Sequence, residues 1–284
     1  MNQNQKIRCA ISTCPNDTFA FHAILDRQVN CRGLDFEIEL LDIQQLNDRL
    51  FQGDFDVAKA SFHAAALLTD KTVVLPSGSA LGFGVGPLLL ANRENTSPDS
   101  LDGLTLCPGK HTTATMLFKM FYGPEKKIEH TVFSEIMPRL KDGTADFGVC
   151  IHEGRFTWKE QGLFHVEDLG TRWEQETSTP LPLGGILARR TLAHDTIDRV
   201  QSTLRDSIEF GLAHRELTLP TMRKYAQEFD DEVLFKHVDL YVNQWTQDLG
   251  NEGNAALKML SEKAMQSGLV EQAAEIEVWG MKRE

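Results

Sequence analysis

The chain has 284 residues, of which 41% are hydrophobic, and its 29 basic and 41 acidic side chains give a formal net charge of −12. This length can fill a large core in one or two domains. The acidic balance disfavours nucleic acid and anionic membranes as partners. No run of about 18 apolar residues is present, so the sequence predicts no membrane-spanning helix.

The N-terminus and the cysteines favour a cytoplasmic protein. Residues 1–8 are polar and lack the apolar core of a signal peptide. Cys9, Cys107 and Cys150 lie in apolar, strand-like runs, which is typical of reduced, buried thiols. Neither a Cys-x-x-Cys nor a His-Glu-x-x-His spacing occurs, so we expect no metal site.

The first half of the chain alternates strand-like with helix-like segments. Strand patterns cover residues 6–11, 35–41, 55–60, 72–75 and 87–91, and helical spacing covers residues 16–25, 43–51 and 62–68. Such alternation predicts an α/β fold with a mainly parallel sheet covered by helices.

A polar stretch, residues 92–100, has the composition of a linker. A second α/β series follows it, and the rest of the chain after residue 188 has a helical pattern to its end. In this second series we predict strands over 104–107, 128–133, 147–151 and 183–188, and helices over 113–121 and 136–140. The later helices are predicted over 197–212, 222–229, 233–245 and 255–265.

One unit occurs in both series: a helix, a Gly-x-x-Asp turn and a strand. The turns are residues 53–56 and 143–146, and the strands after them end at residues 59–61 and at His152. Chance can produce so short a motif. The alternative is two similarly built lobes whose strand ends face a shared cleft, which is a common place for a ligand site.

His152 is the leading candidate for a catalytic group. It ends the apolar run of residues 147–151, and ligands of open α/β sheets bind beyond the carboxyl ends of strands. A histidine there suits a general base, because its ordinary pKa lies near neutrality. Two other histidines fall near the predicted cleft, His63 and His111, and the remaining six are expected at the surface or at helix caps: His22, His130, His165, His194, His214 and His237.

Four further parts of the chain combine a possible ligand contact with an ordinary structural interpretation. Residues 12–19 and 108–114 each follow a strand and open a helix, so their small polar groups and free N–H donors suit an anion, or simply cap the helix. In the first of these segments the predicted cap is Asn16 or Asp17. Lys59 could neutralise an anionic substrate, or lie at the surface. The glycine-dense segment 78–87 leads into a strand, which disfavours nucleotide binding.

Six motifs resemble those of the 1,4-dihydroxy-6-naphthoate synthases, a family of the futalosine route of menaquinone biosynthesis. They occur in the expected order, and one departure is Thr13, where the family pattern has proline. The motifs are Cys14-Pro15-Asn16-Asp17-Thr18-Phe19, Asp42-Ile43-Gln44-Gln45-Leu46-Asn47, Asp56-Val57-x-Lys59-x-Ser61, Gly78-Ser79-Ala80-Leu81-Gly82-x-Gly84-x-Gly86-Pro87, Thr112-Thr113-Ala114 and Ile151-His152-Glu153-Gly154-Arg155.

The resemblance implies a two-lobed fold like that of the type II periplasmic binding proteins, with a cleft between the lobes and a helical C-terminal third. The larger α/β lobe would combine residues 1–91 with 189–284. The smaller α/β lobe would be the inserted segment 92–188. The chain would then cross between the lobes twice.

The resemblance also implies the reaction, the conversion of cyclic dehypoxanthine futalosine to 1,4-dihydroxy-6-naphthoate by a carbon–carbon lyase, with loss of the sugar-derived fragment. His152 carries over as the proton acceptor, with no need for a metal or redox cofactor. The substrate contacts that carry over are Lys59, Ala60, Ser61, Thr113 and Ala114, and Asn16 and Thr112 are possible further contacts. Glu153 and Arg155 are expected to be structural.

Two alternatives remain at this point. A non-catalytic solute-binding protein shares the fold, so the fold alone does not decide. A chorismate dehydratase of the same pathway has similar architecture, although the Cys-Pro-Asn-Asp and His-Glu-Gly-Arg motifs favour the synthase. In each case the expected partner is a small molecule, and the chain is expected to be a monomer or a homodimer.

Overall fold

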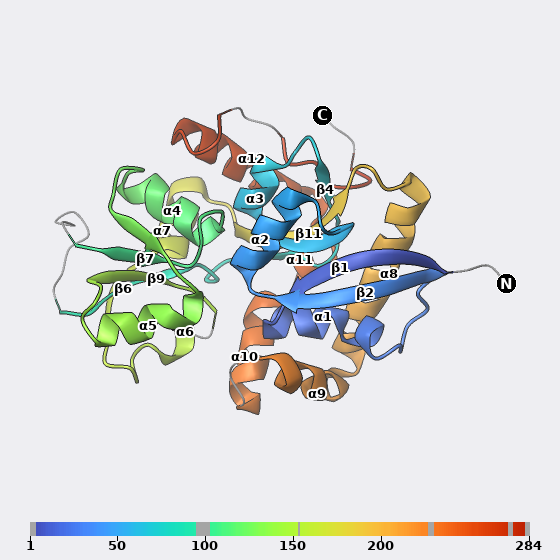
Figure 1. Ribbon diagram of the computed structural model, residues 1–284, viewed down its shortest axis with the longest axis horizontal. Coiled ribbons are helices and arrows are strands. Elements are labelled where there is room, and N and C mark those ends of the chain that lie inside the picture. Colours follow the sequence, from blue (N-terminus) through green and yellow to red (C-terminus); the bar gives the residue numbers. More distant parts are fainter. Residues whose placement is uncertain (1–3, 95–102, 153, 227–229, 272–274, 282–284) are drawn as a thin grey trace.

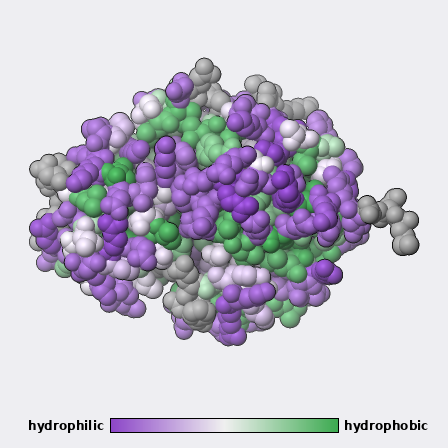
Figure 2. Space-filling view, viewed as in Figure 1, coloured by the Kyte–Doolittle hydropathy of each residue, from purple (hydrophilic) through white to green (hydrophobic). Residues whose placement is uncertain are grey.

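The structure, a computed structural model, describes residues 4–94, 103–152, 154–226, 230–271 and 275–281. Within these ranges the chain forms two β-sheets flanked by helices. No described helix is both long and apolar enough to cross a membrane. Hydrophilic side chains cover most of the face in Figure 2, with hydrophobic ones in smaller areas between them, as the high content of charged residues leads us to expect.

The first sheet takes its strands from two distant parts of the chain. The strands are β1 (Gln5–Ser12), β2 (Leu34–Leu41), β3 (Val57–Ser61), β4 (Thr72–Val74), β5 (Ala80–Gly82) and β11 (Leu181–Arg189). Their order is β2-β1-β3-β11-β4, and β5 also pairs with β11. β1 is parallel to β2 and β3, whereas β11 is antiparallel to β3, β4 and β5.

The second sheet is built from the middle of the chain. Its strands are β6 (Leu88–Ala91), β7 (Thr105–Cys107), β8 (Ile128–His130), β9 (Phe147–Cys150) and β10 (Phe164–Asp168). Their order is β10-β6-β9-β7-β8. β7 is parallel to β8 and β9, whereas β6 is antiparallel to β9 and β10.

The helices fall into two groups in Figure 1. Around the second sheet, at the left, lie α4 (Thr113–Tyr122), α5 (Phe133–Lys141), α6 (Gly154–Thr157) and α7 (Leu169–Thr177). The other helices are α1 (Pro15–Leu25), α2 (Ile43–Gln52), α3 (Phe62–Leu67), α8 (His194–Ala213), α9 (Arg215–Tyr225), α10 (Asp231–Tyr241), α11 (Gln244–Gln247) and α12 (Gly250–Gln266). Of these, α1, α8, α9 and α10 lie around or below the first sheet.

Local sequence explains where α2 begins and ends. Asp42 and Gln45 form a capping box at its start, so two N–H groups that lack helical partners are satisfied by side chains. The helix ends at Gly53, which adopts a left-handed conformation with φ 85°. That conformation is strained for residues with a Cβ, which accounts for glycine at this position.

The repeated unit seen in the sequence has the same physical role in both sheets. Gly53 and Gly143 both have positive φ, 85° and 76°. The carboxylate of Asp56 then accepts from the N–H of Arg8 in β1, at 2.9 Å. That of Asp146 accepts from the N–H of Leu104, just before β7, at 3.0 Å. In each unit the aspartate therefore ties its strand to a neighbouring parallel strand.

Several predicted elements are confirmed and others are wrong. The helices predicted over 43–51 and 113–121 form as α2 and α4, but the helix predicted over 233–245 is broken after Tyr241 into α10 and α11. The sheets are mixed rather than mainly parallel, because β6 and β11 run against their neighbours. The chain is not purely helical after residue 188, since Val278 forms a parallel bridge to Val74.

Four elements lie in sequence for which no strand or helix was predicted: β5, α6, β10 and α7. Most of the predicted linker lies outside the described residues. The division into lobes at 1–91, 92–188 and 189–284 stays a prediction. Strand pairing associates β6 with the second sheet and β11 with the first, so a division drawn by sheets would place both crossings earlier in the chain, before β6 and before β11.

Candidate active site

A cavity of about 690 Å³, including space open to solvent, lies where the two sheets and α10 meet. The first sheet contributes the ends of β1 and β3, and the second contributes the start of α4 and the residues just after β9. The sequence-predicted residues that line it are Asn16, Lys59, Ser61, Thr112, Thr113, Ala114 and His152. Ala60 does not line it, because its side chain belongs to the hydrophobic core behind β3.

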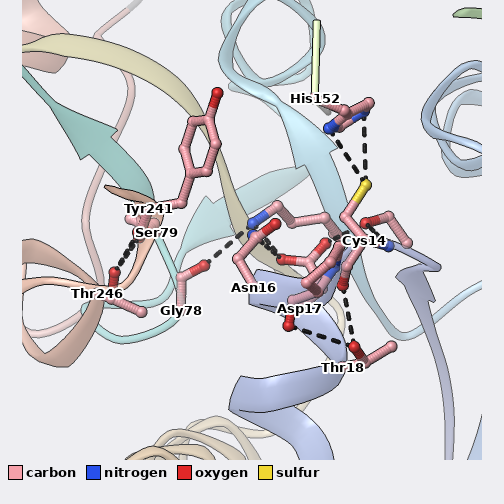
Figure 3. A network of polar contacts seen from close by, with 12 residues as sticks. Cys14, Asn16, Asp17, Thr18, Gly78, Ser79, His152, Tyr241 and Thr246 are labelled. Carbon is pink, nitrogen blue, oxygen red and sulfur yellow. Dashed lines mark hydrogen bonds and ion pairs between the residues drawn. The ribbon is translucent and has the colours of Figure 1, made fainter. Parts of the chain in front are cut away.

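His152 lies just beyond β9 in the left-handed conformation, with φ 57°. This conformation is uncommon for a residue with a Cβ. Its ring packs edge-on against Phe133, with ring centroids 4.7 Å apart. The sulfur of Cys14 contacts its Nδ1 at 3.3 Å and its Nε2 at 3.5 Å (Figure 3). A loop after β1 and a loop after β9 thus meet at this histidine.

Cys14 was missed as a neighbour of the candidate base. The sequence suggested that Asn16 or Asp17 caps the first helix, but this is wrong. The helix starts at Pro15 with Cys14 in the N-cap position. The Asp17 side chain is instead buried, and its Oδ2 accepts a hydrogen bond from the Ser12 hydroxyl at 2.6 Å.

Lys59 and Asp17 form a buried ion pair at the floor of the cavity. Lys59 Nζ lies 2.7 Å from Asp17 Oδ1, with side-chain exposures of 6% and 4%. The ammonium also donates to the carbonyl of Gly78 at 3.3 Å. The interpretation of Lys59 as a surface residue is therefore wrong. Its charge is balanced by Asp17, and a buried lysine requires such a partner.

The three predicted hydroxyl groups are already engaged with backbone carbonyls. Thr113 donates to the carbonyl of Leu183 at 2.8 Å, and Thr112 donates to that of Gly109 at 2.9 Å. Ser61 donates to the carbonyl of His111. Thr112 also caps α4 by accepting from the N–H of Thr115. Thr113 and Ala114, the first two residues of α4, line the cavity. N–H groups at the start of a helix lack partners inside the helix and favour a negatively charged or carbonyl oxygen.

His237 was expected at the surface, and that expectation is wrong. It is 2% exposed and lines the cavity from α10, with its ring 6.2 Å from that of His152 and inclined by 26°. Burial, with smaller contributions from His152 and Lys59, lowers the pKa of His237 well below its usual value. His22 is buried as well, at 4% exposure, on the packed face of α1.

The sequence did contain a signal that His237 is buried. Leu234, His237, Val238 and Tyr241 follow the i, i+3, i+4, i+7 spacing of one helix face, and all four are buried. That face packs inward from α10. Tyr241 lines the cavity beside His237, with ring centroids 4.5 Å apart.

His63 and His111 lie behind the cavity wall, at the junction of α3 with the loop that precedes α4. Their ring centroids are 6.2 Å apart. His63 Nδ1 lies 3.4 Å from the carbonyl of Thr112. Burial, followed by repulsion from His111, lowers the pKa of His63 to about 4. Neither histidine lines the cavity.

The remaining expectations concern Arg155, Glu153, the buried cysteines and a metal site. Arg155 donates to the carbonyl of Gly86 and pairs with Asp168 at 2.7 Å, and these contacts favour the structural role expected of it. Glu153 lies outside the described residues. Cys9, Cys107 and Cys150 are free and buried, as predicted. Over the described ranges, His, Cys, Asp and Glu side chains do not form a group of three that could hold a metal ion.

Comparison with known proteins identifies the family. A family model described as "Menaquinone biosynthesis" matches residues 7–266. A 1,4-dihydroxy-6-naphthoate synthase of Thermus thermophilus is 40% identical over 266 residues, covering 93% of this chain and 96% of that protein. The enzyme of the same name from Streptomyces coelicolor is 37% identical over 271 residues, covering 93% and 94%.

Solved structures show the fold. A protein of Archaeoglobus fulgidus superposes with a TM-score of 0.88 at 33% identity, covering 93% of this chain and 98% of that one. The alkanesulfonate-binding protein SsuA of Xanthomonas axonopodis superposes with a TM-score of 0.74 at 12% identity, covering 98% and 99%, which shows the fold alone. The fold is therefore that of the periplasmic binding proteins, as predicted. The chain itself belongs to the menaquinone biosynthesis family, as an enzyme related to the 1,4-dihydroxy-6-naphthoate synthases.

Proposed function

We propose that this enzyme converts cyclic dehypoxanthine futalosine to 1,4-dihydroxy-6-naphthoate as a carbon–carbon lyase, with His152 as the general base. The observation that carries the proposal is the position of His152, a titratable side chain at the end of a buried strand, in the wall of a cavity shared by both sheets. The names of the two relatives supply the product.

The proposed chemistry begins with removal of a proton from carbon beside the substrate carbonyl. His152 accepts this proton, and the electron pair left on carbon is delocalised into the carbonyl. The carbon–carbon bond to the sugar-derived fragment then breaks: the enolate electrons form the new ring double bond, and the fragment leaves with the electron pair of the broken bond and takes up the proton held by His152. The remaining ring becomes aromatic. A well-placed base of this kind typically contributes about 10²- to 10⁴-fold to the rate.

The proposed substrate contacts surround His152 from both sheets. They are Lys59, Ala60, Ser61, Thr113 and Ala114, with Asn16 and Thr112 as further possible contacts. The hydroxyl groups of Ser61 and Thr113 are used within the protein, so the free N–H groups at the start of α4 are the better donors for a carboxylate or carbonyl oxygen of the substrate. Ala60 would contribute only through its backbone, since its side chain lies in the core.

Replacement of the base tests the proposal. Purified His152→Ala and His152→Gln proteins are incubated with cyclic dehypoxanthine futalosine, and the naphthoate is followed by absorbance and mass. We expect turnover to fall by about 10²- to 10⁴-fold, with thermal unfolding unchanged. His165→Ala, at an exposed position on β10, is the control and keeps wild-type turnover. Wild-type turnover by folded His152→Ala would refute the assignment of the base.

The same assay separates the alternatives. A solute-binding protein, which the fold also permits, would bind a small molecule without forming product. A chorismate dehydratase would consume chorismate instead. If well-folded wild-type protein makes no naphthoate, the proposed reaction is wrong. Cytoplasmic location, a monomeric or homodimeric state and the absence of a cofactor stay predictions.

A further inference from the structure

One ring nitrogen of His237 is buried without a protein partner. Its Nε2 lies 3.0 Å from the side-chain oxygen of Asn16. Its Nδ1 is buried, and the described residues offer it no hydrogen bond. The residue is 2% exposed and lines the cavity, so a ligand in the cavity is the candidate partner for this nitrogen.

The surrounding contacts determine which nitrogen carries the proton. The carboxylate of Asp17 is held by Lys59 and Ser12, so it can only accept hydrogen bonds. Asn16 must therefore turn its NH₂ group toward Asp17, and the two lie 2.8 Å apart. The carbonyl oxygen of Asn16 is then left facing His237. Two acceptors cannot bond to each other, so His237 Nε2 must carry a hydrogen.

The charge of the ring determines whether the other nitrogen, Nδ1, carries a hydrogen. Burial, together with the nearby His152 and Lys59, lowers the pKa of His237 and keeps the imidazole neutral. A neutral imidazole has one N–H and one lone pair. With the hydrogen on Nε2, Nδ1 is an acceptor. A buried acceptor without a partner is unfavourable, which selects for a ligand that donates a hydrogen bond there.

We propose that His237 is a specificity-determining residue that accepts a hydrogen bond at Nδ1 from a hydroxyl group of the substrate. Asn16 acts on it as a positioning residue, because its side-chain oxygen fixes the tautomer of the His237 ring. The ring of His237 lies 6.2 Å from that of His152, so the bound hydroxyl group is held near the proposed base. This inference rests on the proposed function for the identity of the substrate.

Such a contact gives selectivity as well as affinity. A site built to pair with a hydroxyl group discriminates strongly against an analogue that lacks it, because the buried acceptor is then unpaired. A deoxy analogue that lacks the contacted hydroxyl group should therefore bind the wild-type enzyme poorly. It should lose little further affinity when His237 is replaced.

Two amide substitutions of His237 distinguish the roles of its two ring nitrogens. In His237→Asn the amide lies near the former Nδ1 and can still accept from the substrate. In His237→Gln it lies near the former Nε2 and can keep the contact to Asn16 while Nδ1 is lost. We expect His237→Gln to raise KM by about tenfold or more, with a much smaller change in kcat, and His237→Asn to restore part of the loss. Equal effects of both variants would mean a purely structural histidine and would overturn the inference.

A second measurement does not depend on the substrate. Long-range ¹⁵N–¹H NMR of the ligand-free protein reports which ring nitrogen of His237 is protonated, with His237→Gln identifying the signal. We expect hydrogen on Nε2 only. Hydrogen on Nδ1 overturns the inference even if the enzyme turns over the proposed substrate. If instead wild-type protein makes no naphthoate but shows the expected tautomer, the proposed function fails while the acceptor at Nδ1 stands.

Discussion

At the residue scale, the buried ion pair of Lys59 and Asp17 fixes the orientation of several neighbouring side chains. Asp17 also accepts from Ser12 and Asn16, so a single carboxylate orients the end of β1, the start of α1 and the amide that faces His237. A buried pair costs desolvation on both sides, and removing only one partner leaves a charge without compensation. The pair is therefore a sensitive point of the structure.

We predict that Asp17→Asn lowers the free energy of unfolding by about 3–5 kcal/mol, because Lys59 is left buried and unpaired. The double variant Asp17→Asn/Lys59→Met should recover much of this loss. Urea unfolding of the single and double variants measures both. Glu37→Gln, which removes the exposed partner of Lys6, is the control and should change stability little. An Asp17→Asn protein as stable as wild type would contradict this account.

At the scale of elements, the loop before α4, residues 108–112, joins the two sheets. The carbonyl of His111 accepts from the side chains of Ser61 and Asn47, and that of Thr112 accepts from His63. All three donors belong to α2, β3 or α3 on the first sheet. The start of α4, which lines the cavity, is thus positioned by elements of the other sheet.

We predict that Asn47→Leu weakens this junction. Asn47 is fully buried, and its side-chain oxygen accepts from the N–H of Ser61 at 3.1 Å. Leucine has a similar volume but leaves that N–H unpaired, at a cost of about 1–3 kcal/mol. Urea unfolding should show the loss, and KM should rise because Ser61 and α4 shift. Asn251→Leu, at an exposed position on α12, is the control. Equal stability of the two variants would exclude the proposed role of Asn47.

Local sequence predicted the parts of the site that depend on one element. A strand that ends abruptly in a histidine placed His152, and the repeated Gly-x-x-Asp turn indicated that β3 and β9 end in comparable positions. The partners of these residues depend on packing between distant segments. Asp17 meets Lys59, and His237 meets Asn16, only when α1, β3 and α10 are assembled, and periodicity in one segment does not specify that assembly.

Strand direction was mispredicted for a related reason. Apolar runs such as Leu88–Ala91 and Leu181–Arg189 predict burial, and both strands are buried. Their direction depends on how the chain crosses between the sheets. β6 and β11, the first strands after each crossing, run antiparallel to their neighbours. No residue pattern within either strand specifies that direction.

At the scale of the whole molecule, buried neutral histidines make stability depend on pH. His63 is 6% exposed, and burial and the facing His111 and Lys119 lower its pKa to about 4 from an ordinary value of 6.5. Between these values the unfolded chain binds a proton that the folded protein does not. The stabilisation is therefore complete above about pH 6.5 and is lost as the pH falls toward 4, by roughly 3 kcal/mol for His63 alone.

We predict that His63→Asn flattens this dependence. Asparagine can keep a donor near the former Nδ1 for the carbonyl of Thr112, but it does not titrate. The variant can be less stable at every pH, so the informative quantity is the slope of unfolding free energy against pH between about 4.5 and 6.5, measured by urea unfolding. This slope should decrease but not vanish, because His237 titrates in the same direction. The exposed control His165→Asn should keep the wild-type slope, and an unchanged slope in His63→Asn would show that His63 is not a source of the acid sensitivity.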